Sequence, residues 1–524
     1  MTTPAGYGVL LRANLRRDAL QVLAWVLGVT LLYWSQAISI DGLYTSQAQL
    51  DDAAASMGGN AAFVAMAGPA RALDTVGGQV VWQAAAIGAV LVGLMSMFLV
   101  GRHTRVEEEQ GREELLRSAP VGRFAPVSAA ATVAVLANLV VGLGVAASLV
   151  GYGLSPADSW ATGLGLTLTG WVFTGTALVA VQLSASARSA YGVAGSVIGV
   201  SYALRAVGDV TGSGLSWLTP IGWYQALHPF SGLRWWPAML LVVAAGCTGA
   251  LACALLVRRD VGSGLLAARP GPARGALGSG FALTWRLQRP SVIGWSTGLL
   301  LTGLAYGSIG DSVADLVGDS QTSRDLFAVS GADLVDGFYA TSALMLALLA
   351  TGFAISSSLR LRSEEDDGRA ELLLTAGLSR RGWYLAHAAV TAAGSVLVLV
   401  AGGIGIGAGY GLATGGWGRV LRLSLPTLSY LPSVLVCVGL ALLLTGLLPR
   451  WARAAWALLG WAAVVLLLGR TLHLPGWLQG LSPFDHPAAV PAEAFAAAPV
   501  VVLALLATAL GVAAWLTLSR RDIL

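Results

Sequence analysis

Long apolar runs alternate with short charged segments along almost the whole chain. The runs are continuous rather than alternately apolar and polar, so they predict helices and do not fit the strands of a membrane barrel. A helix needs about 20 residues to cross a hydrocarbon core of ~30 Å. The predicted spans cover 18–40, 79–101, 127–151, 160–184, 190–208 and 237–257 in the first half of the chain, and 291–310, 340–360, 384–411, 428–447, 451–470 and 497–518 in the second.

The composition agrees with a membrane protein. Hydrophobic residues make up 56% of the chain and charged residues 11%, whereas soluble domains carry roughly 25% charged residues. We therefore expect an all-α polytopic membrane protein with about twelve transmembrane helices. Arginines gather in alternate connections, which the positive-inside rule assigns to the cytoplasm. This pattern predicts a multi-pass protein of the plasma membrane with both termini on the cytoplasmic side.

One charged segment occurs twice. Residues 105–123 return as residues 362–380 without an insertion, and ten of these 19 positions are identical. Each half begins and ends on the same side, so the chain reads as two parallel six-helix repeats related by a pseudo-twofold axis along the membrane normal. The predicted domains are a first six-helix unit at 1–257, a cytoplasmic linker at 258–290 and a second six-helix unit at 291–524. Each unit ends in the same way, with Arg258-Arg-Asp and Arg520-Arg-Asp.

The repeated segments, at 102–126 and 361–383, are candidates for a docking element. The spacing of Glu108 and Arg112, and of Glu365 and Arg369, predicts i,i+4 ion pairs on helical turns that glycines interrupt. A solvated loop with stop-transfer charge is the alternative, but a surface loop without a partner has no reason to keep both copies alike. The candidate docking residues are Glu107, Glu108, Gly111, Arg112, Glu114, Leu115, Glu364, Glu365, Gly368, Arg369, Glu371 and Leu372.

The absence of lysine excludes one kind of site. All 31 basic residues are arginine, and a phosphate-binding P-loop requires a lysine. Any ATP hydrolysis must then come from another subunit. The three cysteines and five histidines have no disulfide or metal-ligand spacing, so we expect no metal site. No basic patch carries interleaved aromatic residues, which argues against nucleic acid as a partner.

The repeated loop resembles the cytoplasmic loop of ABC-2 type exporter permeases. The shared motif is Glu-Glu-x-x-Gly-Arg-x-Glu-Leu-Leu, which begins here at Glu107 and again at Glu364. The second copy departs from the first with Ala370 in place of Glu113 and Gly377 in place of Pro120. The closest likeness is to fused two-unit actinobacterial permeases of tetronasin and polyketide antibiotic exporters. That resemblance implies two copies of a separate ATPase, which bind ATP and Mg and dock one on each loop, and a hydrophobic small molecule as substrate. The chain itself would hold no cofactor and would not be an enzyme.

The same resemblance places the substrate path between the second, fifth, eighth and eleventh spans. The polar, aromatic or charged candidates there are Gln79, Trp82, Gln83, Tyr202, Arg205, Phe338, Tyr339, Ser342, Trp456 and Arg470. Aromatic residues at a membrane interface are also common anchors. Arg205 and Arg470 are candidates for an outer latch or for attraction of an anionic substrate, and snorkelling to the interface is the alternative.

Two other classes of protein remain open at this point. A proton-coupled secondary drug transporter would need buried carboxylates within its spans, and almost none lie in the middle of an apolar run. A membrane enzyme would need a ligand-like cluster of acids in an outer loop. Residues 311–336 carry six aspartates, but their spacing matches no cation-binding pattern.

Overall fold

The computed structural model describes residues 5–44, 46–58, 61–259, 263–266, 278–309, 334–468 and 475–521. Within these residues all regular structure is helical. Eleven of the described helical segments are long and apolar enough to cross a membrane. The predicted all-α polytopic membrane fold is therefore confirmed.

The chain divides into two compact units, Met1–Gly271 and Pro272–Leu524. The long helices of unit 1 are α1 (Tyr7–Leu43), α4 (Val76–Arg102), α7 (Ala125–Gly151), α8 (Pro156–Leu183), α9 (Ala187–Thr211) and α11 (Trp236–Arg258). Those of unit 2 are α12 (Gly280–Ile309), α15 (Leu334–Ser358), α18 (Arg380–Thr414), α21 (Leu431–Leu447), α22 (Ala455–Leu468) and α24 (Ala497–Arg520).

Corresponding helices have the same neighbours in the two units. In unit 1, α1 packs on α7 and α4, and α8 packs on α4 and α11. In unit 2, α12 packs on α18 and α15, and α21 packs on α15 and α24. The sequence repeat is thus matched by a repeat of helix packing inside each unit. The axis that would relate the units stays a prediction.

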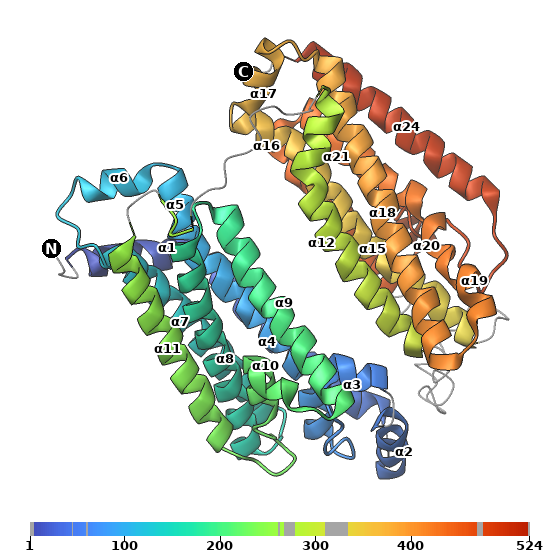
Figure 1. The fold of residues 1–524 in the computed structure, drawn as a ribbon. Helices are drawn as coiled ribbons and strands as arrows, with labels where there is room; N and C mark the ends of the chain where they lie inside the picture. The colour runs from blue at the N-terminus through green and yellow to red at the C-terminus, as the bar shows by residue number, and fades with distance from the viewer. Residues whose placement is uncertain are drawn as a thin grey trace. The chain divides into compact units, whose positions relative to one another are not determined.

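Short helices mark the two ends of each unit. In unit 1, α5 (Arg105–Glu109) and α6 (Arg112–Arg117) lie at one end, while α2 (Gln47–Gly58), α3 (Ala61–Ala67) and α10 (Pro220–Gln225) lie at the other (Figure 1). We call these the α5 end and the α3 end. In unit 2, α16 (Arg360–Asp366) and α17 (Arg369–Thr375) lie at one end, and α19 (Val420–Ser424) and α20 (Pro426–Ser429) lie at the other.

The predicted span at 451–470 differs from the structure. The chain leaves α21 through a 3-10 turn, Pro449–Ala454, and α22 then runs for 14 residues to Leu468. Proline at the start of the turn cannot continue the preceding helix. Residues of the expected span are therefore used in a turn, and the end of that span lies outside the described residues.

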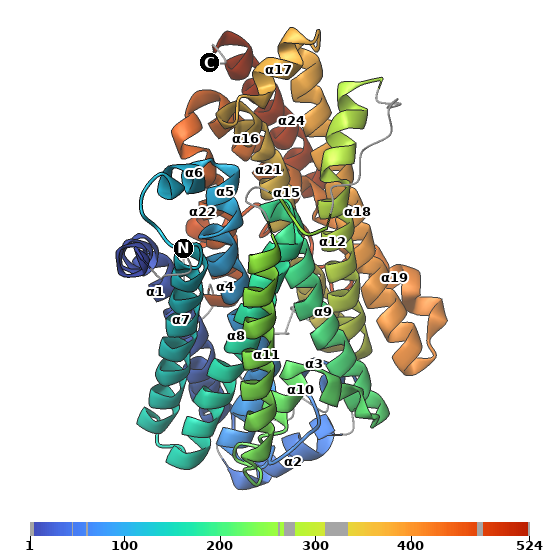
Figure 2. The same cartoon turned by 60° about the vertical axis from the view of Figure 1, so that its left-hand side comes forward.

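The first turns of α1 lie across the α5 end of unit 1, and the rest of the helix runs along the bundle (Figures 1 and 2). Arg12 and Arg16 are exposed on these first turns. An arginine-bearing helix in this position is typical of a segment that lies in the headgroup plane of a membrane.

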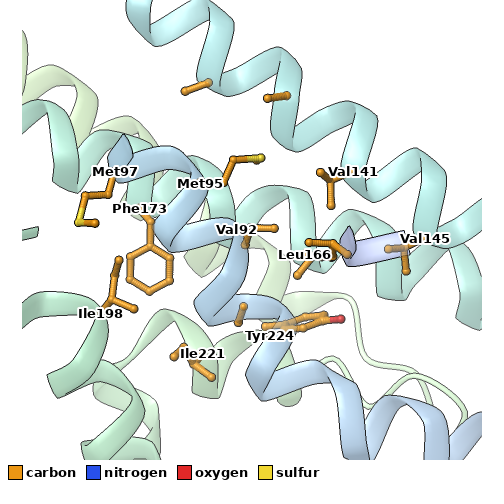
Figure 3. Close-up of a cluster of buried hydrophobic side chains, with 14 of the residues drawn as sticks. Val92, Met95, Met97, Val141, Val145, Leu166, Phe173, Ile198, Ile221 and Tyr224 are labelled. Atoms are coloured by element: carbon orange, nitrogen blue, oxygen red, sulfur yellow. The ribbon is translucent and has the colours of Figure 1, made fainter. Parts of the chain in front are cut away.

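The core of unit 1 is built around α4 and α8. Val92 and Met95 of α4 lie near Phe173 and Leu166 of α8, and Ile198 of α9 closes the cluster from another side (Figure 3). All five side chains are buried. Lipid is as apolar as these side chains, so close packing rather than transfer from water holds such helices together.

Glycines allow a close helix contact in unit 2, between α12 and α18. A Cβ atom on Gly303 would lie 2.3 Å from the Gly402 carbonyl oxygen, and one on Gly307 would lie 2.0 Å from that of Ile406. The backbones could not approach this closely with any larger residue. Small residues spaced in this way are a common device for packing membrane helices.

We expect Gly303→Ala to destabilise unit 2 by about 1–3 kcal/mol, because the added methyl group must push the two backbones apart. Gly298→Ala in the same helix is the matched control, since a Cβ atom there meets nothing within 4 Å. Thermal unfolding in detergent measures the difference. Equal midpoints for the two variants would refute the packing role of Gly303.

Candidate functional site

Each charged loop folds into two short helices joined at a glycine. In unit 1, Gly111 lies between α5 and α6, and in unit 2, Gly368 lies between α16 and α17. Both glycines have a φ of +69°, in the left-handed region that glycine enters without a steric penalty. The prediction that these glycines interrupt the helical turns is confirmed.

The predicted i,i+4 ion pairs are wrong. Arg112 binds Glu107 at 3.0 Å rather than Glu108, and Arg369 binds Asp367 rather than Glu365. The left-handed glycine explains both differences. It ends the first short helix and redirects the chain, so residues four apart across it no longer share a helix face.

In unit 1, Glu108 is held between two arginines from distant parts of the chain. Arg105 Nη1 lies 2.8 Å from the Glu108 carboxylate, and Arg259, just after α11, binds the other oxygen. Arg105 and Arg259 also both donate to the carbonyl oxygen of Val181, at the end of α8. Arg123 donates to the carbonyl of Arg259 at 2.6 Å. We call these residues, Arg105, Glu108, Arg123 and Arg259, the unit 1 clasp.

Unit 2 contains the same arrangement. Glu365 binds Arg362 at 2.9 Å and Arg521, just after α24. Arg521 also donates to the carbonyl of Thr445 in α21, and Arg380 donates to the carbonyl of Arg521 at 3.0 Å. We call Arg362, Glu365, Arg380 and Arg521 the unit 2 clasp. Each clasp joins the charged loop, the start of the third long helix, and the ends of the fourth and sixth.

Electrostatics explains why each clasp contains three arginines and one carboxylate. The side chains of Glu108 and Glu365 are 6% and 3% exposed, and a buried charge is stable only when it is paired and hydrogen-bonded. The surplus positive charge faces carbonyl oxygens at helix C-termini, which carry partial negative charge. The clasp therefore satisfies the carboxylate and the helix ends together.

The acid before each clasp glutamate has different partners in the two units. Glu107 binds Arg17 of α1 and Arg112 of α6. Its counterpart, Glu364, accepts from Trp383 Nε1 at 3.0 Å and lies 3.1 Å from His387 Nε2. The two charged loops are thus built on the same clasp but supported differently beside it.

Other predicted docking residues point outward. Arg112 and Glu114 are exposed in unit 1, as are Arg369, Glu371 and Leu372 in unit 2. Leu372 is 71% exposed. The side chain of Leu115 lies outside the described part of the structure. The other eleven candidates thus divide into inward acids that fix the loop, glycines that shape it, and outward residues that a partner could contact.

Four predicted substrate-path residues of unit 1 bind the backbone of residues 64–73. Gln79 donates to the carbonyl of Leu73, Trp82 to that of Gly68, and Tyr202 to that of Met66. Arg205 is fully buried, donates to Met66 at 2.9 Å and pairs with Asp209 at 3.5 Å. Carbonyls in the last turn of a helix and in the connection after it have no partner within that helix, and these side chains supply one.

The remaining path candidates are placed as follows. Gln83 is half-buried in α4. Phe338, Tyr339 and Ser342 are buried in α15, where Tyr339 donates to the carbonyl of Gly307 at 2.9 Å. Trp456 is 41% exposed on α22. Arg470 lies outside the described residues. A substrate path through these positions stays a prediction.

The clasp arginines were missed as functional residues although the sequence carried a signal for them. Arg105, Arg123 and the second arginine of each Arg-Arg-Asp ending are identical in the two halves. Asp18 was also missed. It is fully buried at the start of a predicted span and binds His103 and Arg102.

Comparison with known proteins gives a relative that covers both units. The chain is 36% identical over 520 residues to the multidrug efflux system permease protein Rv1217c of Mycobacterium tuberculosis, which is 98% of this chain and 94% of the relative. A family model described as the C-terminal domain of multidrug efflux system permease Rv1217c matches residues 277–518. The chain belongs to the Rv1217c permease family. The family model covers nearly all of unit 2, including Glu365 and Arg380 of its clasp, and ends just before Arg521.

We expect Arg259→Gln and Arg521→Gln each to destabilise the protein by about 3 kcal/mol, because each leaves a buried glutamate with one arginine fewer. The neighbouring Arg258→Gln and Arg520→Gln are matched controls, since both arginines are exposed. Thermal unfolding gives the size of the effect, and hydrogen exchange of the α5 and α16 amides locates it.

If the clasp holds α5 in place, only the variant that removes a clasp arginine should speed hydrogen exchange there. Faster exchange in α5 for Arg259→Gln but not for Arg258→Gln supports it. Equal destabilisation by Arg258→Gln and Arg259→Gln would instead mean that the helix end requires positive charge in general and that the pairing with Glu108 has no specific role.

Proposed function

We propose that this chain is the membrane-spanning subunit of an ATP-driven drug exporter of the ABC-2 type. The observation that carries the proposal is full-length similarity to a multidrug efflux system permease, together with a charged loop that occurs once in each half. In this role the chain is a transport protein rather than an enzyme. Its substrate is a hydrophobic small molecule, and its place is the plasma membrane.

ATP hydrolysis is assigned to a separate subunit. The absence of lysine from the sequence supports this assignment, because the phosphate-binding loop of such ATPases needs one. Two copies of the ATPase, with ATP and Mg bound, would dock one on each charged loop. The α5 end of unit 1 and the end of unit 2 that holds α16 and α17 then face the cytoplasm, as do both termini.

The contact surface of each loop consists of its outward residues. In unit 2 these are Arg369, Glu371 and Leu372 on α17, and in unit 1 the corresponding exposed residues are Arg112 and Glu114. Protein interfaces combine a buried apolar centre with a polar rim, and an exposed leucine beside charged residues offers both kinds of contact. The inward acids keep this surface in place.

The clasp gives docking a route to the membrane helices within each unit. A force on α5 acts through Glu108 on Arg259 and so on the end of α11, and through Arg105 on the end of α8. In unit 2 a force on α16 acts through Glu365 on the end of α24. ATP binding by the partner would shift the permease between states only by its different affinity for them.

A proton-coupled secondary transporter is the alternative. The buried pairs of Asp18 with His103 and of Glu364 with His387 would suit it. Export measured after the proton gradient is collapsed, with ATP held constant, separates the two mechanisms. Continued export supports ATP as the energy source, and loss of export supports the alternative.

We expect the double variant Glu371→Arg and Leu372→Ser to lower drug export and co-purification of the ATPase at least tenfold, since it reverses a charge and removes an exposed apolar anchor on α17. Tagged chain from cells that carry the complete exporter is the material for both measurements. Unchanged stability, checked by thermal unfolding, shows that folding is not the cause of the loss.

Asp485→Arg is the matched control, because it reverses an exposed charge in the connection before α24, at the opposite end of unit 2. It leaves α17 untouched and should keep both export and the ATPase. Normal ATPase binding by the α17 variant would remove the docking role of this surface.

A further inference from the structure

A charged cavity lies at the α3 end of unit 1, far from the charged loop. It has a volume of about 240 Å³ and is lined by the turn after α3, the end of α9, the 3-10 turn Gly214–Leu218 and the turn after α10. A smaller cavity of about 30 Å³ adjoins it and shares Arg71, Gln225 and His228 with it. Arg71 comes from the connection after α3, whereas Gln225 ends α10 and His228 lies in the turn that follows it.

Positive charge exceeds negative charge around this cavity. Arg71 and Arg234 both line it, and among the described residues neither guanidinium has an ion pair or a side-chain hydrogen bond. The one carboxylate on the cavity, Asp209, is already bound by Arg205 at 3.5 Å and by Ser216 Oγ at 2.6 Å. Within the described residues, two guanidinium groups thus line the cavity without a direct ion pair.

The titration of the lining groups agrees with this surplus. Burial lowers the pKa of Arg71, Asp209 opposes the shift, and Arg234 adds to it. Burial, then Arg71 and then Arg234 lower the pKa of the half-buried His228 to about 4. The imidazole is therefore neutral at physiological pH and can donate one hydrogen bond.

Backbone strain gathers at the same place. Ala72, His228 and Phe230 have φ values of +47°, +54° and +60°, and they are the non-glycine residues with positive φ in the described chain. His228 lines the cavity, Ala72 follows Arg71, and the amide of Phe230 is held by Asp158 at 2.9 Å. Strain of this kind persists where the surrounding structure enforces it, and it gathers at binding sites.

We propose that this cavity binds an anionic group, a carboxylate or a phosphate, between Arg71 and Arg234 with His228 beside it. Guanidinium groups suit both anions because their planar N–H groups match two oxygens at once. The anion could belong to a dissolved compound or to the headgroup of a surrounding phospholipid. The site is independent of the proposed export function, since it depends only on these residues of unit 1.

The test uses the full-length protein in nanodiscs with histidine labelled by ¹⁵N. In one arm, phosphatidylglycerol replaces part of the phosphatidylcholine, and in the other, inorganic phosphate is added to discs of phosphatidylcholine alone. The His228 imidazole signal, assigned with His228→Asn, reports its pKa. Anion binding neutralises the charge of Arg71 and Arg234 and should raise that pKa.

Arg234→Gln should weaken anion binding at least tenfold, and because Arg234 is exposed, the variant should fold normally. Arg71→Gln with Arg234→Gln should abolish the effect on His228. The control is Arg12→Gln with Arg16→Gln, which removes the same charge from exposed positions at the α5 end. It should change binding less than twofold.

The two arms identify the source of the anion. A response to phosphatidylglycerol alone supports a lipid headgroup, and a response to phosphate alone supports a dissolved anion. An unchanged His228 signal in both arms, or equal binding by Arg234→Gln and the wild-type protein, would overturn the proposal.

Discussion

The buried glutamate in each clasp is the constraint on which the arrangement of the charged loops depends. Glu108 and Glu365 cannot stay away from water unless cations hold them, and in each unit the cations come from the loop itself and from the residue after the last helix. This requirement brings the end of the sixth helix back to the loop. Because the same arginines occupy the carbonyls of other helix ends, one polar cluster fixes several elements at once.

At the opposite end of unit 1, buried polar side chains likewise satisfy backbone carbonyls, and the buried ion pair of Arg205 with Asp209 lies among them. Residues 64–73 comprise the last turn of α3 and the connection after it, so their carbonyls need donors from elsewhere. Gln79, Trp82, Tyr202 and Arg205 provide them from α4 and α9, and Gln225 adds a bond to Ala67 from α10. Polar side chains within apolar helices are here used to hold a connection in place.

The apolar runs predicted the long helices well because span length depends on the membrane, which acts on every helix alike. The exception was 451–470, where a proline turn uses residues that hydropathy alone counts as span. Partners of polar groups were harder to predict. Glu108 and Arg259 are 151 residues apart, and the nearer choice, Arg112, is excluded by a glycine conformation that hydropathy does not report. Likewise, the sequence marked Gln79 and Arg205 as unusual but could not say that backbone carbonyls were their partners.

Fusion of the two halves has a consequence for the acids beside the clasps. Glu107 is supported by Arg17, whereas Glu364 is supported by Trp383 and His387. Halves made as separate chains could assemble as identical pairs, but a single polypeptide always contributes one of each kind. Every molecule is therefore asymmetric by covalent linkage, and natural selection can adjust one half without forcing the same change on the other.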